Sequence, residues 1–475
     1  MTTAAPARQR LKVVCPHDCP DTCVMTVDVE NGRAVALGGD PEHRFTQGFL
    51  CAKVNHYLER VYSPDRVLYP MKRVGRKGEG RFARITWDEA LDTIASRFRE
   101  VIAAHGPQAI LPYSYAGNMG LLSYGSMDRR FFGALGASLL DRTICASAGA
   151  AGIQVTLGKS IGFDPEAVVH SRLIVAWGAN IVSSNVHLWP FIEEARRRGA
   201  RLVVVDPYRS RTAEKADEHL ALLPGTDAAL ANGLLHVMIR DHLLDAEYIR
   251  DRTDGFDDAR RIAASYWPAR VEQLTGVAEH SVVEAAHLLG EAETAMVLTA
   301  RGPEQQARGV ANTLAYINLA LAAGLPGRPN SGFGTITGQG NGQGGREHGQ
   351  KSDQLPGYRH LADPEARRHV AGVWGIDEHA LPSSGKSATE LLQSLGRDIR
   401  ALFVMGFNPV VSAPNALRVR QRIVGLDLLA LAEAELMRGN REAARDYAQR
   451  AFEVSRASGS PRQRDAAARL IERAR

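Results

Sequence analysis

The sequence predicts an α/β protein of several domains, in which a small cysteine-rich domain precedes a domain built on a parallel sheet. Three observations predict this class: a length of 475 residues, four cysteines within the first 51 residues, and a βαβ pattern between residues 172 and 207. At roughly 100 to 200 residues per domain, the length allows about three domains with separate apolar cores.

The composition excludes several functional classes. Lys and Arg total 58 against 53 Asp and Glu, and the net charge of +5 is too small to indicate a nucleic-acid partner. Hydrophobic residues at 44% and charged residues at 23% are typical of globular proteins, and no uncharged stretch predicts a membrane span. Because residues 1–11 lack an apolar segment, we expect no export signal. The odd count of five cysteines argues against a disulfide framework and favours the cytoplasm.

The N-terminal cysteines have the spacing of metal ligands. They are Cys15, Cys19, Cys23 and Cys51. Zinc sites usually take two paired halves, whereas three clustered cysteines and one distant cysteine favour a 4Fe-4S cluster, with zinc or buried free thiols as alternatives. An alternating pattern over residues 24–30 predicts a strand, and Asn31-Gly32 predicts a turn, so the ligands should lie on loops around a β-ribbon. Lys53 would place an ammonium group beside the cluster, unless it is an ordinary surface lysine.

The fifth cysteine, Cys145, stands alone in a segment rich in small residues, 141–152. A lone cysteine is usually a small buried hydrophobic residue. The functional alternative is a thiolate, held by a helix N-terminus or by Arg142, that serves as a metal ligand.

The middle of the chain predicts a βαβ unit. Residues 173–177 and 202–205 are apolar runs typical of buried strands, and the segment between them contains a helix that ends near Gly199. Asp206 follows the second strand, where it would accept hydrogen bonds from a ribose or a purine ring, or would simply cap the next turn. The full glycine fingerprint of nicotinamide sites is absent. Downstream, either Thr226 or Asp227 is predicted to cap a helix.

A glycine-rich segment follows, because residues 324–349 hold ten of the 45 glycines. Glycines let backbone amides approach a ligand closely, so the segment predicts a loop around a polar, phosphorylated cofactor. A flexible linker is the alternative. The presence of Phe333, Ile336, Arg346 and His348 argues against a linker.

Together these motifs resemble the molybdopterin oxidoreductase superfamily over about residues 12–428. The resemblance implies that the four N-terminal cysteines bind a 4Fe-4S cluster and that Lys53 lies between this cluster and the pterin. It implies that Cys145 is the protein ligand to molybdenum, as in the nitrate reductase and formate dehydrogenase branches, and Gly152 matches the same motif further along the chain. It also implies contacts to Mo-bis(molybdopterin guanine dinucleotide) from Trp177, Gly178, Asn180, Asp206, Pro207, Gly225, Thr226, Asp227, Gly338, Gly340, Gly345, Gly406 and Asn408.

The resemblance implies oxygen-atom transfer or dehydrogenation at molybdenum, with electrons relayed through the cluster. Formate dehydrogenases commonly have His directly after the ligand, where this chain has Ala146. Residues 344–349 are similar to assimilatory nitrate reductases, so Arg346 and His348 are the expected catalytic residues, with Arg346 orienting an oxyanion such as nitrate. Nitrate enzymes often carry Met at position 146, and their first cysteine gap is commonly two residues rather than three. No flavin or nicotinamide fingerprint appears, so a separate protein is expected to donate electrons.

The chain changes character after Leu428, where the family continues with further domains that we expect to be missing here. The expected units are a cluster domain (1–66), a discontinuous central α/β domain (67–140 and 330–428), a Rossmann-like dinucleotide domain (141–329) and a helical tail (429–475). The tail resembles one tetratricopeptide helix pair, which would engage a protein partner, or is any amphipathic helical tail. Two hypotheses follow: a working molybdenum reductase, or a non-catalytic scaffold that binds the cluster.

Overall fold

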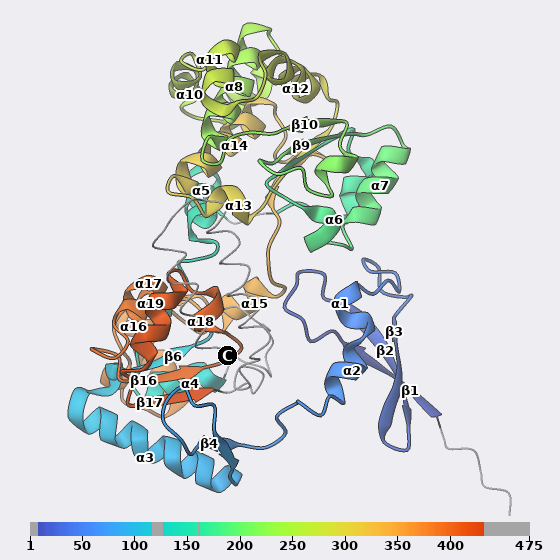
Figure 1. Cartoon of the computed structure of the whole chain (residues 1–475). Coiled ribbons are helices and arrows are strands. Elements are labelled where there is room, and N and C mark those ends of the chain that lie inside the picture. Colours follow the sequence, from blue (N-terminus) through green and yellow to red (C-terminus); the bar gives the residue numbers. More distant parts are fainter. Residues whose placement is uncertain (1–7, 116–126, 160–161, 432–475) are drawn as a thin grey trace, which may run out of the picture.

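The computed structural model describes residues 8–115, 127–159 and 162–431, in three bodies (Figure 1). The first is a small antiparallel domain at the N-terminus. The second is a parallel sheet covered by helices, and the third is a smaller α/β body made from segments on both sides of the second. No helix within the described ranges is long and apolar enough to cross a membrane.

The N-terminal body is a three-stranded antiparallel sheet with two short helices. Its elements are β1 (Arg8–Val14), β2 (Val24–Glu30), β3 (Arg33–Gly39), α1 (Ala52–Asn55) and α2 (Tyr57–Val61). The predicted strand over residues 24–30 is confirmed, and the predicted turn at Asn31-Gly32 has positive φ at both residues, +51° and +74°. Met25, Leu50 and Val54 form the small apolar core. The loops at one end of this sheet therefore carry the cysteines.

The second body is a five-stranded parallel sheet in the order β10-β9-β8-β11-β12. Its strands are β8 (Leu173–Trp177), β9 (Arg201–Val205), β10 (Glu218–Leu220), β11 (Ala295–Thr299) and β12 (Gly332–Thr335). Every residue of β8 and β11 is buried, because helices cover both faces, and this explains their continuous apolar sequences. The predicted βαβ unit is confirmed as β8, α7 and β9.

The helices of this body form two layers on the sheet (Figure 1). They are α5 (Ser147–Leu157), α6 (Ile181–Ser184), α7 (Trp189–Arg197), α8 (Asp227–Arg240), α9 (Ala246–Arg252), α10 (Phe256–Ala263), α11 (Pro268–Thr275), α12 (Glu279–Glu291), α13 (Arg301–Glu304) and α14 (Gly309–Ala322). Helices α8, α12 and α14 pack on one face, and α6 and α7 pack on the other. A Cβ on Gly152 would lie 2.6 Å from Thr313 Cγ2, so this glycine allows α5 and α14 to pack closely.

The third body is a parallel sheet in the order β17-β16-β6. Its strands and helices are β6 (Ile110–Tyr113), β16 (Ala401–Val404), β17 (Leu428–Leu431), α3 (Trp87–His105), α4 (Met127–Ala134), α16 (Pro364–Trp374), α17 (Ala388–Gln393), α18 (Pro409–Ser412) and α19 (Ala416–Ile423). Short ribbons complete it: β4 (Met71–Arg73) with β5 (Phe82–Arg84), β7 (Leu140–Asp141) with β15 (Lys386–Ser387), and β13 (Gln354–Leu355) with β14 (Arg359–His360). Helix α15 (Gly342–Glu347) lies in the glycine-rich segment.

Two expectations about these bodies were wrong. The boundary at residue 330 placed residues 332–335 in the central domain, but they form β12 and pair with β11 of the dinucleotide-type sheet. The glycine-rich segment is therefore not one continuous loop, since β12 and α15 interrupt it. Residues 332–335 form a strand because they pair with β11, and a short run that contains glycines has no local sequence pattern that predicts such pairing.

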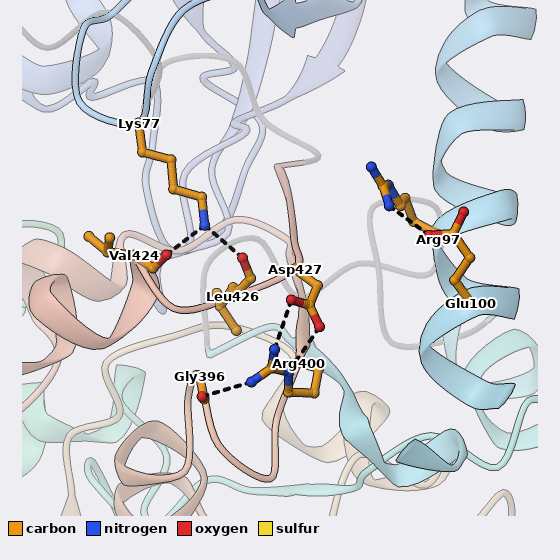
Figure 2. Close-up of polar contacts among 8 residues, drawn as sticks. All are labelled: Lys77, Arg97, Glu100, Gly396, Arg400, Val424, Leu426 and Asp427. Carbon is orange, nitrogen blue, oxygen red and sulfur yellow. Dashed lines mark hydrogen bonds and ion pairs between the residues drawn. The ribbon is translucent and has the colours of Figure 1, made fainter. Parts of the chain in front are cut away.

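The helical tail was also expected to begin at residue 429, but Leu428–Leu431 forms strand β17. A short apolar run is ambiguous between helix and strand, and pairing with β16 selects the strand. Figure 2 shows how this edge is held: Arg400 donates two hydrogen bonds of 2.9 Å to Asp427, and Lys77 Nζ donates to two carbonyls just before β17 at 2.6 Å each. The rest of the expected tetratricopeptide-like tail, residues 432–475, lies outside the described residues.

Candidate cofactor site

The four N-terminal cysteines converge at one end of the small antiparallel sheet. Three come from the loop between β1 and β2, where Cys15 N–H donates to Cys23 O at 2.9 Å, and Cys51 lies directly before α1. Burial first, and then the charges of the three other thiols and Asp21, raise the pKa of Cys23 to about 12, which places all four sulfur atoms in one neighbourhood. A bound cation would remove this mutual repulsion between thiolates.

The spread of these thiols fits a cluster better than a single ion. Within the described ranges, no three His, Cys, Asp or Glu side chains lie close enough together to hold one metal ion. A zinc ion needs all four sulfur atoms around one centre, whereas in a 4Fe-4S cluster each cysteine binds a different iron. Three thiols from one loop and a fourth at the start of α1 supply the four sulfur ligands that a cubane cluster takes.

A buried histidine joins this cysteine loop to the large sheet. His187, between α6 and α7, places Nδ1 at 2.6 Å from Asp21 Oδ2 and Nε2 at 3.0 Å from Phe49 O. Its ring nitrogens lie 3.8 and 3.9 Å from Cys23 Sγ. His187 and Asp21 are 2% and 4% exposed, so this pair fixes the cysteine loop against the second body. The sequence analysis missed both residues, because the contact joins positions 166 residues apart and has no local pattern.

A cavity of about 350 Å³ opens beside this pair, at the carboxyl end of β12. Asp21 Oδ1 and Asn185 Oδ1 are buried lining atoms without a hydrogen-bond partner. Buried acceptors of this kind normally receive hydrogen bonds, so they fit a group that presents N–H donors, as pterin and guanine rings do. The carboxyl end of a parallel sheet is also where α/β proteins commonly bind nucleotide-like ligands.

The glycine-rich segment connects the cysteine loop with the Cys145 segment. Within its second half, Gly340 N–H donates to Asp18 O at 3.3 Å, and a Cβ on Gly340 would lie 2.8 Å from Thr22 Cγ2. At its end, Gln350 O accepts a hydrogen bond of 2.6 Å from Arg142 Nη1. The glycine is thus required where the segment passes the cysteine loop, and the segment continues to the neighbourhood of Cys145.

Cys145 lies between β7 and α5, directly before the N-cap residue of that helix. Tyr115 Oη accepts hydrogen bonds from its N–H at 2.8 Å and from Ile144 N–H at 2.5 Å, and Gln305 Nε2 donates to its carbonyl at 3.3 Å. Burial raises the pKa of the Cys145 thiol, and Arg301 opposes this shift.

The cation beside Cys145 differs from the one expected. Arg142 donates to Ser114 O at 2.7 Å, Ser114 Oγ at 2.8 Å and Gln350 O at 2.6 Å, so its guanidinium orders the backbone around the site. The guanidinium that acts on the thiol belongs to Arg301. Sequence reasoning missed Arg301 because 156 residues separate it from Cys145.

The segment 405–409 lies on the other side of Tyr115. Phe407 contacts the Tyr113 and Tyr115 rings, with centroid distances of 5.0 and 5.8 Å. Gly406 has φ +58°, and Asn408 Oδ1 accepts from Val410 N–H at 3.2 Å as the cap of α18. The structure therefore brings this predicted segment beside the Cys145 segment.

The predicted dinucleotide residues between 177 and 227 lie near the carboxyl edge of the large sheet. Trp177 is fully buried, and its Nε1–H donates to Asp227 Oδ1 at 2.9 Å; Gln306 donates to Asp227 Oδ2 at 3.3 Å. Burial raises the pKa of the Asp227 carboxyl, and the bond from Trp177 opposes this. Thr226 is the N-cap residue of α8, which confirms one of the two predicted positions, although its hydroxyl donates to Leu223 O at 2.6 Å and makes no hydrogen bond to the helix.

The other predicted residues have simpler surroundings. Gly178 has φ +60° and faces Pro303, whose Cδ would lie 2.4 Å from a Cβ there. Asn180 Oδ1 accepts from Thr212 Oγ1 at 3.0 Å, and Asp206 Oδ1 accepts from Tyr208 N–H at 2.9 Å. The remaining residues are exposed or half-buried on loops and short helices: Lys53, Pro207, Gly225, Gly338, Gly340, Gly345, Arg346 and His348.

A four-thiol centre beside a parallel sheet, with a glycine-rich segment leading to a further cysteine, is the arrangement expected of an iron–sulfur protein that binds a nucleotide-like cofactor. Comparison with known families agrees: residues 66–431 match the molybdopterin oxidoreductases, and residues 9–63 match the molybdopterin oxidoreductase Fe4S4 domain. The chain belongs to the molybdopterin oxidoreductase family. Membership implies molybdenum–molybdopterin and a 4Fe-4S cluster as its cofactors.

Several relatives share this architecture. The chain is 36% identical over 434 residues to the Bacillus subtilis protein described as "Probable oxidoreductase YoaE", covering 88% of this chain and 59% of the relative. It is also 36% identical over 416 residues to the assimilatory nitrate reductase catalytic subunit of the same organism, covering 86% and 57%. Formate dehydrogenase H of Escherichia coli is 28% identical over 429 residues, with 89% and 59% covered.

Among solved structures, acetylene hydratase from Pelobacter acetylenicus has the same fold, with a TM-score of 0.69 at 24% identity. The match covers 88% of this chain and 60% of that one. The chain thus spans about three fifths of the length of the relatives it matches.

Proposed function

We propose that this protein reduces nitrate or a similar oxyanion at a molybdenum centre whose protein ligand is Cys145. The contacts of the segment around Gly340 and Gln350 with both the cysteine loop and Arg142 support the proposal, because a cofactor between the cluster and Cys145 would need these segments to lie close together. The nitrate reductases of Bacillus subtilis and Synechocystis, at 36% and 31% identity, support the choice of substrate.

Bound molybdenum supplies two-electron chemistry and the cluster supplies single-electron relay, while the protein orients the cofactor and substrate. In this proposal Cys15, Cys19, Cys23 and Cys51 hold the cluster, Lys53 lies between cluster and pterin, and Arg346 and His348 face the substrate. The dinucleotides contact Trp177, Gly178, Asn180, Asp206, Pro207, Gly225, Thr226, Asp227, Gly338, Gly340, Gly345, Gly406 and Asn408. A separate protein donates the electrons.

Formate is the second candidate substrate, because formate dehydrogenases match the chain at 28% and 29% identity over similar lengths. Ala146 argues against it, since formate dehydrogenases commonly have His at this position. Within the assigned domains, the dinucleotide unit is extended to include β12, as its pairing with β11 requires.

Metal analysis and turnover of the full chain test the proposal. The protein is purified anaerobically, its iron and molybdenum are measured, and nitrate consumption is followed with reduced viologen as electron donor. We expect both metals together with nitrate-dependent viologen oxidation. Iron without molybdenum would refute the proposal in favour of a non-catalytic scaffold, and formate oxidation without nitrate reduction would favour the second candidate.

A further inference from the structure

Helix α13 places two charged residues beside the Cys145 segment. The helix begins directly after β11, at the carboxyl edge of the large sheet, with Arg301 as its first residue and Glu304 as its last. The next residue, Gln305, donates to Cys145 O at 3.3 Å. Glu304 itself lies against Gly149 in the first turn of α5, the helix that follows Cys145. This turn therefore forms one wall of the Cys145 site.

Glu304 is a buried carboxylate in a tight space. Its side chain is 1% exposed, and a Cβ on Gly149, in the first turn of α5, would lie 2.3 to 2.5 Å from its carboxylate atoms. Arg301 Nη1 lies 2.8 Å from Glu304 Oε2, but neither carboxylate oxygen has a hydrogen bond of good geometry. Only glycine at position 149 leaves room for this carboxylate next to the helix that follows Cys145.

Arg301 has unused donor capacity at the site. Among the residues that the structure describes, none forms a hydrogen bond with its buried Nε, and the side chain is 21% exposed, whereas that of Glu304 is 1% exposed. A guanidinium carries five N–H donors in a planar fork, which suits anions with two or more oxygens.

The other two guanidinium groups expected at this site have other bonds. Arg142 donates to Ser114 and Gln350, and Arg346 Nε donates to Gly342 O in its own helix at 3.3 Å. We propose that Arg301, in addition to Arg346, binds the anionic oxygen atoms of the substrate beside Cys145, and that Glu304 is the positioning residue that directs its guanidinium there. This inference rests on the proposed function for the kind of substrate, an oxyanion, and adds the residue that recognises it.

The test uses the metal-loaded full chain with the variants Arg301→Gln, Arg301→Lys and Glu304→Gln, and with Arg308→Gln as the control. Arg308 is an exposed residue before α14, so its loss removes the same charge away from the site. Two quantities are measured: the KM and kcat for nitrate with reduced viologen, and the concentration of nitrate or thiocyanate that half-saturates the change in the molybdenum(V) EPR signal. Iron and molybdenum contents are measured for every variant.

We expect Arg301→Gln to raise the KM and the half-saturating anion concentration at least tenfold, with a smaller change in kcat and unchanged metal content. Arg301→Lys should show an intermediate effect, since a point charge replaces the fork. Glu304→Gln should raise both concentrations severalfold in the wild-type background and leave them unchanged in the Arg301→Gln background, a dependence that a purely structural role would not produce. Arg308→Gln should stay within twofold of the wild type.

Equal half-saturating concentrations in Arg301→Gln and Arg308→Gln would overturn the inference. If Arg301→Gln fails to load molybdenum, the loaded Arg301→Lys variant decides, and wild-type anion binding in that variant would also overturn it. A wild-type protein that binds thiocyanate at the molybdenum(V) centre but does not reduce nitrate would refute the proposed substrate alone. The half-saturating thiocyanate concentrations of Arg301→Gln and Arg308→Gln, measured by EPR, would still decide the inference about Arg301.

Discussion

Replacement of Asp227 by alanine should destabilise the dinucleotide-type body, because the buried Trp177 would lose its hydrogen-bond acceptor. Trp177 is 0% exposed and Asp227 is 4% exposed, so water cannot readily replace the carboxylate. Leaving the Nε1–H unsatisfied costs about 1 to 3 kcal/mol, and loss of the hydrogen bond to a charged group accounts for a similar range. We therefore expect Asp227→Ala to lower the free energy of unfolding by about 2 to 3 kcal/mol.

Urea unfolding monitored by tryptophan fluorescence measures this effect. Asp227→Asn is the matched variant, because its amide oxygen still accepts from Trp177, and we expect it to cost less than about 1 kcal/mol. The exposed control Asp254→Ala should stay within about 0.5 kcal/mol of the wild type. In a double-mutant cycle with Trp177→Phe, the coupling energy should reach about 1 kcal/mol or more. Equal losses in Asp227→Ala and Asp227→Asn would refute this reasoning.

Three further predictions concern the site. Cys145→Ala should abolish activity and retain the iron, whereas Cys19→Ala should lose iron in metal analysis; full activity in the first variant would contradict the ligand assignment. Gly149→Ala should lower the free energy of unfolding by about 1 to 3 kcal/mol, because the added Cβ would collide with the Glu304 carboxylate. Denaturation experiments measure this loss, and Glu304→Ser, which shortens the colliding side chain, should recover part of it. Burial raises the folded-state pKa of Asp227, so the folded protein holds the proton on this carboxyl more tightly than the unfolded chain does. The stability that this proton contributes is complete below the unfolded pKa of about 3.9 and is lost as the pH rises through the raised folded-state pKa. The free energy of unfolding of the wild type should therefore fall with rising pH relative to that of Asp227→Asn.

Local patterns determined much of the fold. The alternating run over residues 24–30 and the apolar runs over 173–177 and 202–205 became strands at those places, because strand side-chain periodicity and full burial leave a direct trace in sequence. The strand at residues 428–431 was not predictable in this way, because a run of four apolar residues is compatible with either helix or strand. Its pairing with β16 depends on a segment distant in the sequence.

The sequence by itself determined the family, the grouping of the N-terminal cysteines and the likeness of the middle domain to a nucleotide-binding sheet, since each depends on spacing within a short stretch of chain. Only the tertiary structure decided which charges surround that chemistry. His187 meets Asp21 across 166 residues, and Arg301 rather than Arg142 acts on Cys145, because packing of β11 and α13 against α5 brings these groups together. Such contacts depend on how separate segments pack, and no local periodicity records them.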